Sequence, residues 1–314
     1  MRIPDELLNC VVFVGQTVQS GSVESVYLGG TGFIVSFPSE RFPGSDHLYL
    51  VTAKHVVDEL AGRRVCFRLN SADQNQYLLI PAADRLRWWF HPDKPDSVDV
   101  AVTPWRATRH PTSDKIVGNP FGPVANFGAV PPPMFVNDQV INDYHIGPGD
   151  EVVIIGLFTK LEGKSKNHPI VRIGNLAMMP DDYIPRVKIG NWVGESPGYL
   201  IEARSIGGLS GSPVFVRVSA AKEERCPYTN QPFPFLGTGP SFLLGLTHGH
   251  WSIKAEDKNE VRFNTTATED RVNMGIAIVV PAYKILEVLN HPELVADRRR
   301  AEEEVASADK STPG

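Results

Sequence analysis

Short apolar runs, many of them alternating with polar positions, follow one another along most of the chain and are bounded by Gly, Pro, Asn or Asp. Such runs predict β-strands, because successive side chains of a strand point to opposite faces and turn residues mark its ends. About a dozen short strands at this spacing indicate a barrel or a sandwich. The predicted strands cover residues 10–15, 25–37, 47–53, 64–69, 76–81, 98–104, 151–158, 169–179, 198–204, 212–218, 241–248 and 274–280.

A helical pattern is convincing only near the C-terminus. There Pro281 precedes AYKILEVLN, whose Ile285, Leu286 and Leu289 form one apolar face, and proline is favoured at the first position of a helix. Residues 291–314 then place three arginines four residues before three glutamates and end in small polar residues. We expect these residues to form a charged, flexible tail with a solvated helix that frays.

The predicted strands fall into two halves, separated by residues 105–148, which are rich in Pro, Asn and Gly. We interpret this segment as a long connection between two domains, with some local structure of its own. The chain has 314 residues and is 42% hydrophobic, which is enough to fill a substantial core. A folded globular protein is therefore expected.

Charge and cysteine content narrow the class of protein further. Lys and Arg number 31 against 36 Asp and Glu, a formal net charge of −5 without a basic cluster, so nucleic acid is not an expected partner. The N-terminus lacks the basic and apolar segments of a signal peptide, and no apolar run reaches the roughly 18 residues of a membrane span. Three distant cysteines, Cys10, Cys66 and Cys226, favour a reducing compartment over a disulfide or zinc framework. We expect a cytoplasmic protein with no membrane partner.

The stretch SIGGLSGSPVFV, residues 205–216, contains the first candidate for chemistry. Ser210 stands among Gly207, Gly208 and Gly211, just before an apolar strand. Glycine permits a turn with positive φ and a close backbone approach, so the serine hydroxyl could be exposed while neighbouring N–H groups converge on one point. That arrangement suits a nucleophile, although the same pattern alone more often forms a plain tight turn.

Two further polar positions could complete such a site. His55 ends the apolar run of YLVTAKHVV, where it is either an ordinary surface residue or a base. Asp99 lies between two valines in SVDVAV, and a buried acid needs a hydrogen-bond partner. That partner is either a set of backbone N–H groups or an imidazole, which the carboxylate would orient and stabilise as a cation. Asp96 is the alternative acid, but Asp99 leads directly into the strand.

Seven segments in order resemble the landmarks of the chymotrypsin-like (trypsin-like) serine peptidases, nearest the bacterial housekeeping and glutamyl-endopeptidase branches. The resemblance covers residues 9–290. It implies an all-β fold of two antiparallel six-stranded Greek-key barrels with a C-terminal helix and an active site between the barrels. Residues 1–115 would form the barrel that carries His55 and Asp99, and residues 116–290 the connection and the barrel that carries Ser210. The seven segments are GGTGFIV, VTAKHVV, DSVDVAV, GDEVVIIG, GGLSGSPVF, LLGLTHG and MGIAIVVPAYKIL.

The resemblance implies a serine endopeptidase that acts on a peptide or protein substrate and needs no cofactor. Ser210 would attack the peptide carbonyl, His55 would take its proton and return it to the leaving amine, and Asp99 would orient His55. The backbone N–H groups of Gly208 and Ser210 would form the oxyanion hole.

The chain departs from the family pattern in several places. Val56 replaces the cysteine that follows the histidine in the digestive branch, and Leu209 replaces the acid that pairs with a new N-terminus when a zymogen is activated. Because 24 residues follow Asn290, we expect the chain to differ from the many bacterial relatives that carry a C-terminal peptide-binding domain. A cytoplasmic peptidase without a zymogen switch needs another restraint, either narrow specificity or an oxyanion loop that a substrate or a regulatory partner protein corrects.

Substrate preference depends on the strand LLGLTHGHW, which should line the primary specificity pocket. The candidate pocket residues are Thr247, His248, His250 and Arg204. Acid-preferring relatives have a histidine at about the position of Thr247, and the cations His248, His250 and Arg204 of this chain suggest a pocket for Glu or Asp. Alternatively, Arg204 forms a structural ion pair and the histidines lie at the rim. His248 and His250 share one strand face and could bind a metal, but the sequence offers no third ligand, so no metal site is predicted.

Two other enzyme classes are excluded by spacing. GLFTKLEGKS ends like a phosphate-binding loop, but six residues separate its glycines where four are required. An α/β-hydrolase elbow needs glycine where the chain has Ser212, and it needs helices between parallel strands. The alternative that stays open is a catalytically silent or latent protease-fold module that binds peptides or a partner protein.

Overall fold

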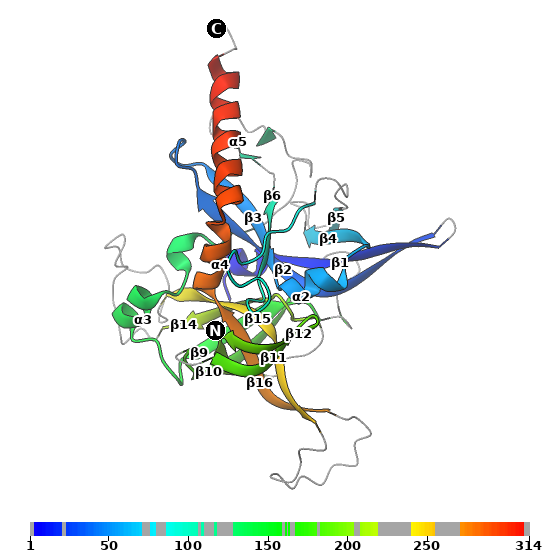
Figure 1. Ribbon diagram of the computed structural model, residues 1–314, viewed down its shortest axis with the longest axis vertical. Coiled ribbons are helices and arrows are strands. Elements are labelled where there is room, and N and C mark those ends of the chain that lie inside the picture. The colour runs from blue at the N-terminus through cyan, green and yellow to red at the C-terminus, as the bar shows by residue number, and fades with distance from the viewer. Residues whose placement is uncertain are drawn as a thin grey trace.

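Two six-stranded antiparallel sheets, one from each half of the chain, form the body of the molecule in the computed structural model. They lie one above the other in Figure 1, with the N-terminal sheet in blue and cyan and the C-terminal barrel in green to orange. The structure describes residues 3–20, 23–70, 76–79, 86–105, 108–109, 116–117, 128–158, 161, 163, 167–180, 183–203, 208–218, 240–254 and 271–310.

The N-terminal sheet has the strand order β5-β4-β1-β2-β3-β6. Its inward positions are apolar: Phe33 on β2 pairs with Val11 on β1 and with Val51 on β3, and all three side chains are buried. Helix α2 follows β3 directly, which places the start of the helix at the edge of this core. The elements are α1 (Asp5–Asn9), β1 (Val11–Ser20), β2 (Val23–Pro38), β3 (Asp46–Thr52), α2 (Lys54–Glu59), β4 (Arg64–Asn70), β5 (Gln76–Leu79) and β6 (Ala101–Trp105).

The C-terminal sheet closes on itself as a barrel in the order β10-β13-β16-β15-β14-β9. A separate two-stranded hairpin, β11–β12, packs against it through buried Ile184, Val187 and Ile189, which contact Ile278. The barrel strands and the hairpin are β9 (Glu151–Gly156), β10 (Ile170–Met178), β11 (Tyr183–Ile189), β12 (Trp192–Pro197), β13 (Tyr199–Glu202), β14 (Pro213–Arg217), β15 (Ser241–Lys254) and β16 (Arg271–Pro281).

The described part of the predicted connection joins the two sheets. Val130 bridges Val35 of β2, and Phe135 bridges Leu243 of β15. Both residues belong to one apolar core that runs from the N-terminal sheet into the barrel. This continuity fixes the two sheets against each other, and a site between them can therefore be preorganised. The remaining elements of this segment are β7 (Thr108–Arg109), β8 (Ile116–Val117), η2 (Pro132–Met134) and α3 (Asp138–Tyr144).

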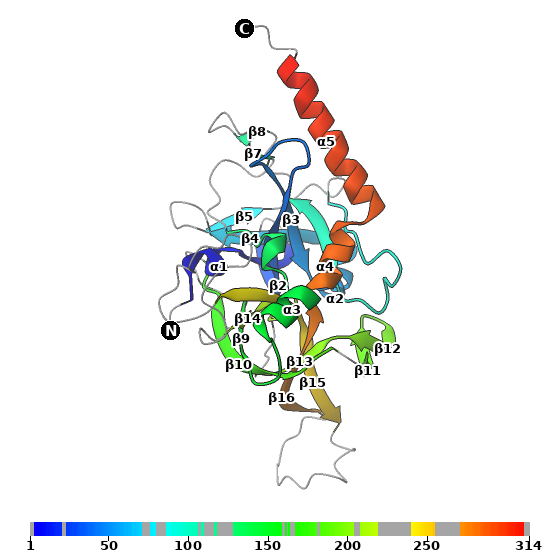
Figure 2. The same cartoon turned by 90° about the vertical axis from the view of Figure 1, so that its left-hand side faces the viewer.

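Two helices end the chain. The predicted helix is α4 (Ala282–Leu289), which buries Ile285 and Leu289 in the core shared by the two sheets. It is followed by α5 (Pro292–Lys310), which runs beside the N-terminal sheet and then projects away from the body (Figures 1 and 2).

The tail differs from the solvated helix that the charge pattern suggested. Arg298 is buried, donates hydrogen bonds to the Tyr49 hydroxyl (3.1 Å) and the Leu289 carbonyl (2.8 Å), and lies over the Phe37 ring. Glu302, also buried, accepts hydrogen bonds from Ser39, the Glu40 N–H and His47. The arginine and glutamate therefore bond to partners outside α5, which anchor the first half of the helix.

The prediction of a mainly β fold with two antiparallel six-stranded units and a late helix is confirmed. Of the two predicted barrels, the C-terminal one is closed, and the described strands of the N-terminal one form a six-stranded sheet with β5 and β6 at its ends. Within the described ranges, none of the helices combines the length and the apolar character needed to cross a membrane. Cys10 and Cys66 are buried free thiols, and Cys226 lies outside the described residues.

Candidate active site

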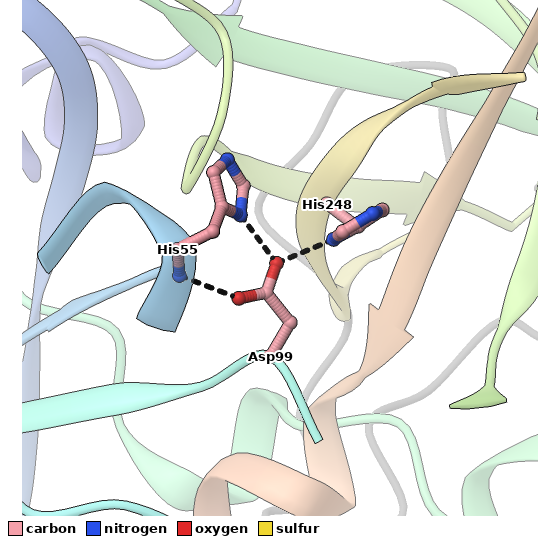
Figure 3. A group of neighbouring side chains, drawn as sticks. All are labelled: His55, Asp99 and His248. Carbon is pink, nitrogen blue, oxygen red and sulfur yellow. Dashed lines mark hydrogen bonds and ion pairs between the residues drawn. The ribbon is translucent and has the colours of Figure 1, made fainter. Parts of the chain in front are cut away.

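His55 is positioned by the junction between β3 and α2. Ala53, extended at φ −74° and ψ 141°, is the last residue before α2, so His55 lies in the first helical turn, where backbone N–H groups lack partners within the helix. Its N–H donates to Asp99 Oδ1 at 2.8 Å, and its ring Nδ1 bonds to Asp99 Oδ2 at 2.7 Å (Figure 3). One carboxylate therefore fixes both the backbone and the ring of His55.

Asp99 lies just before β6, between the buried Val98 and Val100, and is itself fully buried. This corrects the predicted strand over 98–104, which begins only at Ala101. Burial acts to raise the pKa of Asp99, but His55 and His248 outweigh it and hold that pKa well below its usual range. Asp99 is therefore an ionised carboxylate, and both imidazoles must donate to it.

The charge of Asp99 also sets the protonation of His55. Burial acts to lower the pKa of His55, but the Asp99 carboxylate, with smaller contributions from Glu59 and Asp58, raises it above the ordinary value. In the neutral ring, the proton on Nδ1 is held by Asp99, so Nε2 carries the free lone pair. An imidazole held in this way has the chemistry of a general base.

Ser210 lies in the turn before β14, between Leu209, which is fully buried, and Gly211. Gly208 and Gly211 have φ of 96° and 80°, in the region that only glycine adopts easily. A Cβ on Gly211 would come within 2.1 Å of the Thr31 carbonyl and 3.0 Å of the Ala53 nitrogen. The serine turn is thus packed against the end of β3 and against Ala53, two residues before His55.

The Ser210 hydroxyl makes a long hydrogen bond, 3.4 Å, to the His248 carbonyl. Among the residues that the structure describes, no hydrogen bond joins this hydroxyl to the His55 ring. The structure therefore brings His55 into direct contact with Asp99 and places Ser210 beside them, with its hydroxyl turned elsewhere. Nucleophile–base contacts are often long or absent until substrate binds.

Thr31 holds the serine turn from the other sheet and was missed by the sequence analysis. Its hydroxyl donates to the Gly208 carbonyl at 2.7 Å and accepts from the Leu157 N–H at 2.9 Å. Its own N–H donates to the Ser210 carbonyl at 2.9 Å. The signal was present in GGTGFIV, where a hydroxyl residue interrupts an apolar strand and, when buried, needs partners.

The structure describes the side chains of two of the four residues predicted to line a specificity pocket, Thr247 and His248. Thr247 is fully buried, and its hydroxyl donates to the Ser212 carbonyl at 3.2 Å. His248 points to Asp99, with 2.5 Å between Nδ1 and Oδ2 (Figure 3). Arg204 and the side chain of His250 lie outside the described residues.

The sequence offered only two possible metal ligands, His248 and His250. In the structure, His248 instead lies beside two other side chains that could bind a metal ion. His55, Asp99 and His248 each provide one ligand atom, and these atoms lie within 4.8 Å of one another. The facing atoms, however, are already joined by hydrogen bonds of 2.7 and 2.5 Å. A metal ion would have to displace both ring protons, so the geometry fits a hydrogen-bonded site better than a metal centre.

Comparisons with known proteins show no matching family model and no matching curated protein. The Rv3671c protease from M. tuberculosis, in its active form, is a similar solved structure with 15% identity and a TM-score of 0.44, covering 91% of this chain and 81% of its own. Deg5 is similar with 14% identity and a TM-score of 0.42, covering 90% of this chain and 88% of its own. At such identities, the functional argument rests on the residues of the site.

Proposed function

We propose that the protein is a serine endopeptidase that cleaves peptide bonds through an acyl-enzyme intermediate, with Ser210 as nucleophile, His55 as base and Asp99 as the orienting acid. The observation that carries the proposal is the two-point attachment of His55 to a buried, ionised Asp99. This attachment leaves Nε2 free to accept a proton. A glycine-bounded serine turn packed against the same strand end supplies the nucleophile.

Acylation would proceed as follows. The Ser210 hydroxyl rotates from the His248 carbonyl to His55 Nε2 and attacks the carbonyl carbon of the scissile bond, while its proton passes to Nε2. Asp99 stabilises the resulting imidazolium. When the tetrahedral intermediate collapses, the C–N bond breaks and the imidazolium gives the proton to the leaving amine. Water then repeats the sequence on the acyl-enzyme and regenerates the serine.

The oxyanion of each tetrahedral intermediate would be bound by the N–H groups of Gly208 and Ser210. Removing one such donor typically costs about 10²- to 10³-fold in rate. The hydrogen bonds from Thr31 to the carbonyls of Gly208 and Ser210 support this role, because they fix the backbone of the turn before substrate arrives.

Substrate preference stays a prediction. With His248 engaged by Asp99, a preference for Glu or Asp on the acyl side of the cut would depend on Arg204 and His250. A peptide library tests the prediction directly. Enrichment of acidic residues at that subsite would support it, and cleavage that ignores them would contradict it.

A latent or silent protease-fold module is the second candidate, and one observation favours it. The Ser210 hydroxyl is bonded to the His248 carbonyl and not to His55. A module of this kind would bind peptides without turning them over.

Hydrolysis of a diverse peptide library by the wild type and by Ser210→Ala separates the two candidates. The peptidase proposal predicts products with new amino termini from the wild type alone, while both proteins keep the same folded stability. Peptide binding by both proteins without products from either would favour the silent module and contradict the proposal.

A further inference from the structure

His248 occupies an irregular point of the barrel. Along β15, Thr247 pairs with Val279 of β16 and Gly249 pairs with the adjacent Ile278, so His248 is the extra residue of a β-bulge. Bulges break the ladder locally and redirect a side chain, and they are frequent beside active sites. Here the bulge directs the imidazole out of the strand and toward Asp99, which comes from the other sheet (Figure 3).

The residue contacts all three members of the proposed triad. Its Nδ1 lies 2.5 Å from Asp99 Oδ2, the same oxygen that His55 uses. Its ring stands edge-on to the His55 ring, with 5.2 Å between centroids and 74° between planes. Its carbonyl accepts the hydrogen bond of the Ser210 hydroxyl.

We propose that His248 is a positioning residue for the peptidase reaction, a second imidazole that fixes the Asp99 carboxylate by donating to it and thereby sets the basicity of His55. The expected effect of His248 on the reaction rate rests on the proposed function. Its expected effect on the protonation of His55 does not.

His248 can affect His55 because the two imidazoles share one oxygen of the Asp99 carboxylate. Neutral His248 can donate to Oδ2 and hold the carboxylate in the plane that His55 needs. If this donor is lost, the Asp99 carboxylate keeps more of its negative charge for the His55 ring and is less firmly held in position. The His55 imidazolium is then stabilised more strongly, while the orientation of the ring is less well fixed.

The other charged groups around His55 are the same in all the variants that the test compares. Asp58 and Glu59 of α2 act on its ring, and Lys54 is paired with Asp58 at 2.7 Å. Within the described part of the chain, the His248 side chain bonds to Asp99 and its ring contacts the His55 ring.

The test compares His248→Asn with His248→Leu. Asparagine can keep an N–H donor near the position of Nδ1, whereas leucine removes the donor. His168→Asn, at an exposed position, controls for the loss of an imidazole elsewhere. The first readout is the NMR titration of the His55 ring, which needs no catalysis. The second is kcat per titrated active site together with KM.

The pH midpoint of the His55 titration is expected to be lowest in the wild type, higher in His248→Asn and highest in His248→Leu. A lost hydrogen bond to a charged group predicts that His248→Leu lowers kcat about 10- to 100-fold at similar KM, while His248→Asn stays within about 3-fold. An unchanged His55 midpoint in both variants, or equal kcat in wild type and His248→Leu, would overturn the inference. If the His55 midpoint shifts in the variants but the wild-type protein cleaves no peptide, the coupling of His248 to His55 is supported and the peptidase proposal is contradicted.

Discussion

Thr31→Val tests how the two sheets cooperate to build the Ser210 turn, which is proposed to bind the oxyanion. Valine keeps the branched shape of threonine but removes the hydroxyl, so the Gly208 carbonyl and the Leu157 N–H both lose their bond to it. The backbone bond from residue 31 to Ser210 remains. The substitution therefore removes one side of the clamp on the turn without changing its packing.

The magnitude follows from burial. Each buried polar group left without a partner costs about 1–3 kcal/mol, so the free energy of unfolding should fall by roughly 2–6 kcal/mol if neither group finds a new partner. A displaced Gly208 N–H should slow acylation, by up to about 10²- to 10³-fold if that donor is lost entirely. Urea unfolding measures the first effect, and the rate of labelling by a fluorophosphonate probe measures the second.

Thr31→Ser is the matched control, because serine keeps the hydroxyl and lacks only a methyl group. It should lose about 1 kcal/mol of stability and should keep its labelling rate within a few-fold of the wild type. Labelling of folded Thr31→Val at the wild-type rate would refute the argument that this hydroxyl positions the turn.

Three further predictions follow from the same geometry. Gly211→Ala should cost more than about 3 kcal/mol in urea unfolding, against about 1 for Gly44→Ala, because both glycines have positive φ but only Gly211 has no room for a Cβ; equal losses would contradict this. Arg298→Ala should cost about 2–3 kcal/mol and the exposed Arg299→Ala under about 0.5, measured in the same way, because only Arg298 makes buried hydrogen bonds. In a pH profile, kcat/KM should fall as pH decreases through the raised pKa of His55, since only the neutral ring accepts a proton, and a midpoint below the ordinary value of about 6.5 would contradict the account.

Most strands could be predicted from the sequence because their apolar positions are continuous or alternate cleanly. The β11–β12 hairpin could not, since Pro185 and Gly194 interrupt its pattern and a strand with such residues looks like a loop. Helix α3 carries a start signal, Asn137 capping the Val140 N–H at 2.9 Å, but it is short and follows a proline-rich run.

The site was predictable to the extent that each residue has its own local pattern. His55, Asp99 and Ser210 could be proposed because a polar residue beside an apolar strand is conspicuous. The role of His248 could not, because a bulge changes the direction of a side chain without changing the alternation of the sequence. The docking of α5 was equally hidden, since the charge pattern around Arg298 fits a solvated helix until its tertiary partners are known.

The most direct test of the account is the reaction of the wild-type protein with a fluorophosphonate probe, with the modified residue located by mass spectrometry and Ser210→Ala and His55→Ala as comparisons. The account predicts a single adduct on Ser210, absent from Ser210→Ala and formed far more slowly in His55→Ala. Folded wild-type protein that forms no adduct, or that forms it equally fast without His55, would contradict the claim that these residues make an activated serine.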